Sequence, residues 1–315
     1  MRIKVTLGVC LKDCETDIKR IIDMINDLDF PHKNIEVLFV EGGSKDNTLS
    51  LIMRLALDLN MNYRILTNKT KNLGLSRELV LENAQGDYIV WIDDGTIFPK
   101  NYVRLLEEVM GRNINAGIAT GILDIYRGSN LVATLENMSY IAAIENMKSF
   151  NTFRNSNVLR LYKKQKEKNT IKLPGTSGSI YRVTAAKQAG GFDKRNKGVS
   201  EDSDIACRIL QIGWKILIIP ILFSRDYNMN CVSVFKKNLW YGYGSHFVLH
   251  KNKELREILM KSTPPAGFLQ GILVLNIIYK ITRRKTALLL PFFYFLCRIS
   301  FCLGFLMSHF DSYGH

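Results

Sequence analysis

Strand-like apolar runs alternate with helical patterns through the first hundred residues of the chain. The runs are short and rich in β-branched residues, and the segments between them carry apolar residues at helical spacing. Strands that are apolar on both faces must be covered by other elements on both faces. This is typical of a parallel sheet between two layers of helices. The pattern predicts an α/β domain with a mostly parallel central sheet, and the strand runs that carry it are residues 4–10, 35–40 and 88–92.

Such sheets bind ligands in the loops at the carboxyl ends of their strands. The first loop of interest begins at Glu41 and continues through Gly42 and Gly43 to Ser44 and Asp46. Glycines let the backbone approach a ligand closely, and an acid at a strand end can accept hydrogen bonds from ribose hydroxyls. An ordinary capped turn between a strand and a helix explains the same residues.

The second loop begins with two adjacent carboxylates, Asp93 and Asp94, directly after an apolar strand. Two such carboxylates are costly to place there unless a cation pairs with them. Mg²⁺ and Mn²⁺ prefer oxygen ligands shared with phosphate, so a metal bound to a diphosphate would meet this need. The alternative is a solvated loop in which Asp94 and Gly95 form a turn.

A third acidic segment opens a predicted helix with Glu201, Asp202 and Asp204, and Arg208 follows one turn later. Acidic residues at a helix N-terminus often serve only as partners of the helix dipole. Three acids within four positions exceed that need, so one of them is a candidate general base.

In this order, the three segments resemble the family 2 glycosyltransferases, which have the GT-A nucleotide-binding fold. The resemblance covers about residues 3–245. Residues 9–15 correspond to the opening strand and the loop around the base, and residues 72–78 to a stretch along the donor site. Further matches lie on the acceptor side and before the C-terminal appendage, at residues 190–193, 201–202, 208, 213–214 and 241–244.

The resemblance implies a role for each matched residue. Asp202 would be the catalytic base, and Asp93 and Asp94 would bind the metal, Mg²⁺ or Mn²⁺. Two departures weaken the metal motif: Gly95 stands at its third position, and no histidine is evident around residues 225–228. The remaining implied donor-binding residues are Cys10, Glu15, Glu41, Gly43 and Arg77, and the acceptor-side residues are Glu201, Asp204, Arg208, Trp214 and Gly178.

The C-terminal region changes character, with apolar runs at residues 266–279 and 286–307 joined by a basic connector at 280–285. Fourteen helical residues reach only about 21 Å, short of a hydrocarbon core of roughly 30 Å. The second run is long enough to cross but contains Pro291 and Arg298. Membrane association is expected, with spanning or interfacial helices both open. The alternative is a buried helical hairpin in a soluble domain.

The expected domains are a GT-A domain at 1–228, a helical linker at 229–262 and a hydrophobic helical membrane-associated tail at 263–315. Within the first, the donor half covers about 1–112 and the acceptor half about 113–228. The formal net charge of +14 favours an anionic partner. Because the positive charge clusters beside apolar segments, as in residues 145–172, the expected partner is an anionic membrane surface and not nucleic acid. The six cysteines lack the spacing of a disulfide framework, which favours a cytosol-facing domain.

Together these observations predict an inverting, metal-dependent hexosyltransferase at the cytoplasmic face of the cell membrane. It would transfer a sugar from a UDP- or GDP-linked donor to a lipid-linked or lipid-phosphate acceptor, in polysaccharide or glycolipid biosynthesis. The alternative is a non-catalytic sugar-nucleotide-binding protein on the same fold, which Gly95 motivates. A retained base at Asp202 argues against that alternative, because a binding protein needs none.

Overall fold

The computed structural model describes residues 2–70, 72–123, 130–139, 175–195, 200–225, 230–251 and 263–311. The chain divides into two compact units. Unit 1 comprises Met1–Asp124 and Leu173–Arg225, and unit 2 comprises Ile125–Lys172 and Asp226–His315. The domain boundary expected at residue 228 and the whole of the basic segment 145–172 lie outside the described residues.

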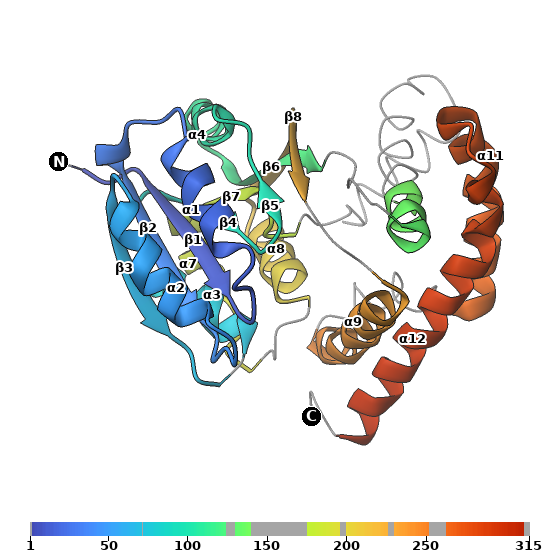
Figure 1. The fold of residues 1–315 in the computed structure, drawn as a ribbon. Coiled ribbons are helices and arrows are strands. Elements are labelled where there is room, and N and C mark those ends of the chain that lie inside the picture. The colour runs from blue at the N-terminus through green and yellow to red at the C-terminus, as the bar shows by residue number, and fades with distance from the viewer. Residues whose placement is uncertain are drawn as a thin grey trace. The chain divides into compact units, whose positions relative to one another are not determined.

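The core of unit 1 is an eight-stranded mixed sheet in the order β3-β2-β1-β4-β7-β6-β8-β5 (Figure 1). The first four strands along the chain are parallel to one another, as the sequence pattern predicts. β7 is antiparallel to both of its neighbours, and β5 is antiparallel to β8. The strands are β1 (Val5–Leu11), β2 (Ile35–Glu41), β3 (Asn62–Thr67), β4 (Tyr88–Ile92), β5 (Thr96–Ile97), β6 (Ala116–Leu123), β7 (Ser179–Arg182) and β8 (Lys215–Arg225).

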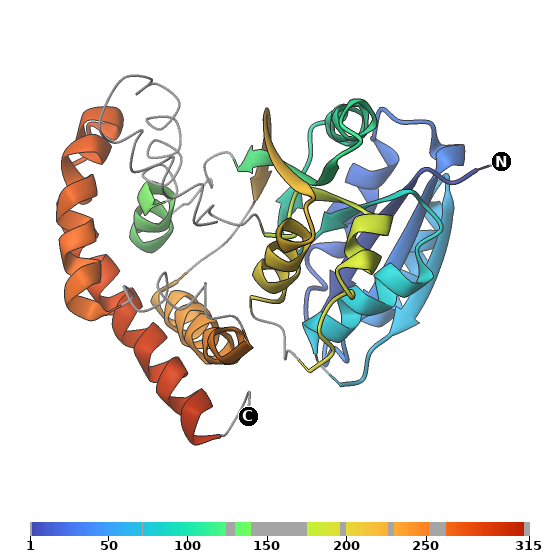
Figure 2. The same cartoon turned by 180° about the vertical axis from the view of Figure 1, so that it is seen from behind.

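Helices cover both faces of this sheet, as Figure 2 shows from behind. Val37 and Phe39 of β2 pack with one helical layer, whereas Leu38 and Val40 pack with the other, because successive side chains of a strand point to opposite faces. The first layer contains α1 (Ile18–Asn26), α2 (Thr48–Leu55) and α4 (Tyr102–Arg112). The second layer contains α3 (Leu73–Asn83), α7 (Val183–Gln188) and α8 (Glu201–Gln211). Unit 1 also has two short 3-10 helices, η1 (His32–Asn34) and η2 (Ala56–Asp58).

Unit 2 is helical in its described part. It contains α9 (Cys231–Lys251), α11 (Pro264–Thr282), the 3-10 helix η3 (Lys285–Leu289) and α12 (Leu290–Phe310). α12 packs against both α9 and α11. Gly242 and Gly304 mark its closest approach to α9, where an added Cβ would overlap backbone of the other helix. Two segments, Pro264–Thr282 and Lys285–Phe310, are long and apolar enough to cross a membrane by length and composition.

Candidate active site

A buried arginine joins the second acidic loop to the third acidic segment. Arg77 of α3 is only 3% exposed, and its Nη2 lies 3.2 Å from Oδ1 of Asp93, just after β4. Its Nη1 forms an ion pair with the buried carboxylate of Glu201, the first residue of α8. Burial disfavours the charged guanidinium, but Asp93 and Asp202 outweigh it, so the pKa of Arg77 lies above its ordinary value. The two acidic segments therefore share one cation in the core of unit 1.

A second arginine, which the sequence interpretation did not assign, lies against the same loop. Arg225 is the last residue of β8, and its Nη2 is 3.2 Å from Oδ1 of Asp94 and 4.0 Å from Oδ2 of Asp93. Its Nε also donates to the backbone carbonyl of Asp94. Burial and the neighbouring Asp93 raise the pKa of the Asp94 carboxyl, while Arg225 opposes that rise. The only signal in the sequence was an arginine at the end of an apolar strand, where the family pattern led us to look for a histidine.

The loops after β1 and β2 are held together by hydrogen bonds to acidic and hydroxyl side chains. Glu41 is buried at the end of β2, and its Oε1 accepts a hydrogen bond from the backbone N–H of Ser44. Glu15 accepts from the backbone N–H of Asn47 at 3.0 Å. Asp13 accepts a hydrogen bond from the backbone N–H of Lys45 at 2.7 Å. These carboxylates therefore shape the first loop, whatever else they bind.

Gly43 and Cys10 have distinct local roles at the same sheet edge. Gly43 has φ +74°, a conformation that side chains rarely adopt, so the turn after β2 needs glycine there. Cys10 lies near the end of β1, and burial raises the pKa of its thiol to about 12, although nearby Arg77 opposes the rise. A thiol of that pKa stays neutral at physiological pH, and the donor-binding role of Cys10 stays a prediction.

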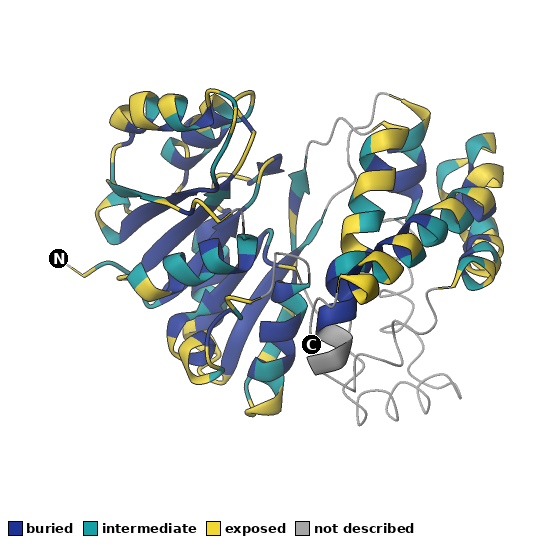
Figure 3. Ribbon diagram, turned by 90° about the horizontal axis from the view of Figure 1, so that it is seen from below, coloured by how far each residue is buried: buried dark blue, intermediate teal, exposed yellow. Residues whose placement is uncertain are grey.

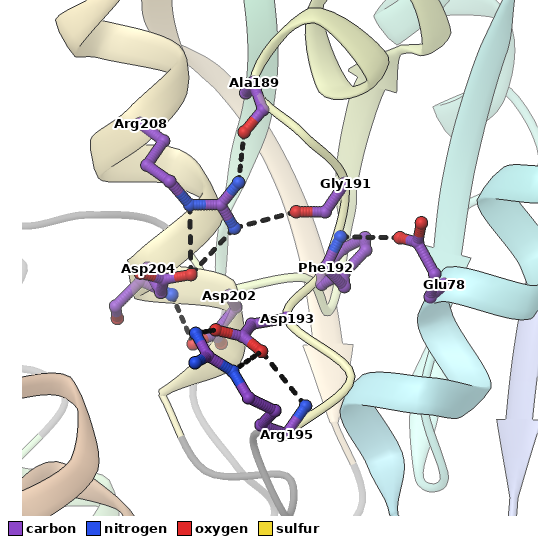
Figure 4. Close-up of polar contacts among 10 residues, drawn as sticks. Glu78, Ala189, Gly191, Phe192, Asp193, Arg195, Asp202, Asp204 and Arg208 are labelled. Atoms are coloured by element: carbon purple, nitrogen blue, oxygen red, sulfur yellow. Dashed lines mark hydrogen bonds and ion pairs between the residues drawn. The ribbon is translucent and has the colours of Figure 1, made fainter. Parts of the chain in front are cut away.

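The first turn of α8 carries three acids whose surroundings differ. Asp204 is buried and forms an ion pair with Arg208, 2.7 Å away, and Arg208 also donates to backbone carbonyls of Ala189 and Gly191 (Figure 4). Asp202 is partly exposed, and its Oδ1 accepts from the backbone N–H of Ser203. With Glu201 and Asp204 each paired to a buried or half-buried arginine, Asp202 is the member of the three that solvent reaches.

α3 anchors the turn that precedes α8. Oε2 of Glu78 accepts a hydrogen bond from the backbone N–H of Phe192 at 2.6 Å (Figure 4), and burial raises the pKa of Glu78. Gly191 has φ +68°, and an added Cβ would strike the Glu78 carboxylate. Phe192 meets Trp91 of β4 edge to face, with ring centroids 5.4 Å apart. These contacts hold the turn at Gly191 and Phe192 close to the end of β4.

Two residues implied on the acceptor side have packing contacts in this structure. Gly178 has φ +72°, and a Cβ there would strike the ring of Phe223. The indole N–H of Trp214 donates to Oε1 of Gln188 at 3.0 Å. Their contribution to acceptor binding stays a prediction.

The metal-binding potential of the site rests on Asp93 and Asp94. Among the described residues, no group of three or more His, Cys, Asp or Glu side chains is placed to hold a metal ion. Gly95, with φ +73°, supplies no ligand. Mg²⁺ often binds through one or two carboxylates together with substrate phosphates. The two aspartates fit a divalent cation on that condition, with a diphosphate as the further ligand.

Comparisons with known proteins agree with this geometry. Residues 6–190 match the model of glycosyl transferase family 2. A 105-residue stretch is 30% identical to "Glycosyltransferase GlyA" of Streptococcus pneumoniae serotype 4, covering 33% of this chain but only 14% of that relative. The matched stretch therefore spans only a small part of the length of that relative.

Solved structures share the fold at low sequence identity. The mannosyltransferase PcManGT from Pyrobaculum calidifontis, in complex with GDP-Man and Mn²⁺, superposes with a TM-score of 0.64 at 14% identity, covering 99% of this chain and 88% of that one. S. aureus TarS 1–349 in complex with UDP gives 0.52 at 15% identity, covering 99% and 92%. Glucosyl-3-phosphoglycerate synthase from Mycobacterium tuberculosis gives 0.51 at 13% identity, covering 78% and 79%.

The family match covers more than half of the chain, and the strand-end acids, Arg77 and α8 meet on a sheet of the GT-A type. The chain belongs to glycosyl transferase family 2.

Proposed function

We propose that the protein is an inverting hexosyltransferase that uses a UDP- or GDP-linked sugar and a membrane-associated acceptor, lipid-linked or a lipid phosphate. The observation that carries the proposal is the Arg77 bridge, which ties Asp93 at the end of β4 to Glu201 beside Asp202 on α8. A donor-side acid and a candidate base are thereby held by one buried residue. The solved relatives titled with GDP-Man, UDP or UDP-GlcNAc support a nucleotide-sugar donor.

The donor would bind along the carboxyl ends of β1, β2 and β4. The proposed nucleoside site is lined by Glu41 and Glu15, together with the turn at Gly43 and Cys10. Asp93 and Asp94 would hold Mg²⁺ or Mn²⁺, which would neutralise charge on the diphosphate when bound. Arg77 sets the position of the Asp93 carboxylate, and Arg225 sets that of Asp94. Both arginines also place positive charge near the departing diphosphate.

Asp202 would act as general base for the acceptor. Its carboxylate takes the proton of the acceptor hydroxyl while that oxygen bonds to the anomeric carbon. The bond from this carbon to the nucleoside diphosphate breaks on the opposite face, which inverts the configuration. Glu201, Asp204 and Arg208 hold the helix turn that presents Asp202.

The same arrangement allows a sugar-nucleotide-binding protein without turnover, which Gly95 in the metal motif favours. The two functions differ in one measurement. Incubation with UDP- and GDP-sugars and a lipid extract yields a nucleoside diphosphate and a glycosylated lipid only if the protein is a transferase. Binding without release of diphosphate in every combination would favour the binding protein.

Removing one carboxylate of the metal pair tests the donor site. In calorimetry, we expect Asp94→Ala to weaken binding of a nucleoside diphosphate with Mn²⁺ at least about tenfold. A polar interaction with a charged group contributes about 1.5–3 kcal/mol to the free energy, and the variant loses such an interaction. EDTA should have a similar effect on the unsubstituted protein. Asp23→Ala is the matched control, since Asp23 pairs with Lys19 on the surface of α1. Affinity that withstands both EDTA and Asp94→Ala would show that the donor binds without a metal.

A further inference from the structure

The burial pattern of α12 differs from that expected in a water-soluble bundle. Its buried positions are the small residues Ser300, Gly304 and Ser308 together with Leu290, Pro291 and Phe301, whereas many other large apolar side chains point outward. Phe292 is 60% exposed, Leu296 61% and Phe310 81%. Together with Leu303, Leu306 and Met307, these exposed residues follow i, i+4, i+7 spacing and form one stripe along the helix. A soluble helix would bury that stripe, so the pattern argues against the buried hairpin left open by the sequence.

α11 likewise exposes large apolar side chains, and it adds positive charge. Gly267 and Gly271 are buried where this helix meets α12, and Val274 and Ile278 are buried as well, but Leu269, Ile272 and Leu273 are exposed. Figure 3 shows exposed positions along these two helices. Small residues between helices and large apolar residues outside are typical of helices in contact with lipid. The turn between α11 and α12, taken with the last turn of α11, exposes four cationic residues: Lys280, Arg283, Arg284 and Lys285.

The side of α12 that packs on α9 carries polar contacts as well as Phe301 and Phe305. His246 of α9 lies 3.4 Å from His309, and the Tyr243 hydroxyl donates to Asp311. α9 also carries Lys236 and Lys237, and Lys237 forms an ion pair with Glu136. Near the middle of α12, the Arg298 guanidinium lies 3.5 Å from Oε1 of Gln270. Only one side of the helix pair is therefore suited to hydrocarbon.

We propose that α11 and α12 lie flat in one leaflet of an anionic membrane and do not cross it. The outward stripe of α12 and the exposed apolar residues of α11 enter the acyl region, while the four cations of the turn meet lipid phosphates. Crossing would carry Arg298 and the polar contacts of α9 to the depth of the hydrocarbon, where charged groups are costly. An in-plane helix immerses only one face, by about 5–10 Å. The inference deepens the membrane acceptor of the proposed function and rests on it for its biological meaning.

Vesicle binding tests the surface without any sugar transfer, so its failure and that of the transferase proposal are distinguishable. Full-length protein is floated with vesicles of phosphatidylcholine containing or lacking phosphatidylglycerol. We expect binding to the anionic vesicles, and a loss of at least about tenfold in the partition coefficient for Phe292→Ser with Leu296→Ser and Leu303→Ser. The matched control places three serines at exposed apolar positions of unit 1, Met53, Leu57 and Ile114, and should bind like the unsubstituted protein. If the triple variant does not fold, Leu273→Ser alone should show a smaller loss in the same direction.

A second pair of substitutions tests the contribution of positive charge to vesicle binding. Arg284→Gln with Lys285→Gln should remove most of the preference for anionic vesicles and leave weak binding to neutral ones. Equal binding of all variants would overturn the proposed surface. So would a stable soluble dimer in light scattering, with no vesicle binding, because a second copy would then cover the stripe.

Measurements of the depth of α11 and α12 in the bilayer distinguish helices that lie in one leaflet from helices that cross the membrane. Tryptophan is introduced singly at Leu273, Leu296 or Leu306, and its quenching by lipids brominated at shallow or deep acyl positions is compared with that of the parent. An in-plane pair gives similar, shallow quenching at all three sites. A profile in which Leu296→Trp is quenched mainly by deep bromines and Leu306→Trp by shallow ones would show a crossing helix and overturn the proposal.

Discussion

Asp202→Asn is expected to lower the rate of sugar transfer by about 10²–10⁴-fold, the range a general base contributes. Asparagine keeps the size of the side chain and the bond from Ser203 N–H, but it cannot accept the acceptor's proton. The loss corresponds to roughly 3–5 kcal/mol of transition-state stabilisation. Release of nucleoside diphosphate under saturating donor measures the change, and donor affinity by calorimetry should stay within about twofold.

Two comparisons decide whether the lower rate of sugar transfer results from the loss of the general base. Asp23→Asn, a surface aspartate of α1, should leave turnover unchanged. An acceptor that is a lipid phosphate is already ionised at neutral pH, so with such an acceptor the loss should be much smaller. Full activity of Asp202→Asn with a hydroxyl acceptor would remove Asp202 from the base role while leaving the family assignment intact.

Arg77→Met is expected to destabilise the protein by about 3–5 kcal/mol, because it leaves buried carboxylates without their cation. Glu201 is 3% exposed, so water cannot readily replace the guanidinium beside it, and Asp93 would keep only Arg225, 4.0 Å away. For a unit of this size, the melting temperature should fall by roughly 10 °C. Arg104→Met is the matched control: Arg104 pairs with Asp29 and Glu108 on the surface, and its loss should leave the melt nearly unchanged.

A double variant separates lost charge balance from lost packing. Arg77→Met with Glu201→Met removes both charges at the α8 contact, and it should be more stable than Arg77→Met alone. A melt of Arg77→Met within a degree of the parent would show that the bridge does not hold the two acidic segments together. The sequence alone would not have suggested this experiment, since it placed Glu201 beside the acceptor and not in an ion pair with Arg77.

The amino-acid sequence was sufficient for the α/β class and for the parallel half of the sheet. Period-2 and period-3.6 patterns are local, and unbroken β-branched runs such as those of β2 and β4 indicate strands covered on both faces. It did not predict that β7 runs antiparallel between β4 and β6, because an apolar run carries no information on strand direction. The strand-end positions of Asp93 and Asp94 followed from the run before them.

The contacts of those residues needed the tertiary structure. Asp94 and Arg225 are 131 positions apart, and Arg77 and Glu201 are 124 apart, so no local pattern relates them. Composition likewise showed that residues 286–307 are apolar, but not which side of that helix is covered. Packing on α9 decided it, because Gly242 and Gly304 let the backbones approach on the face of α12 that holds Ser300, Phe301 and Gly304. Local patterns determine which elements form, and long-range packing determines which side chains meet and which face remains exposed.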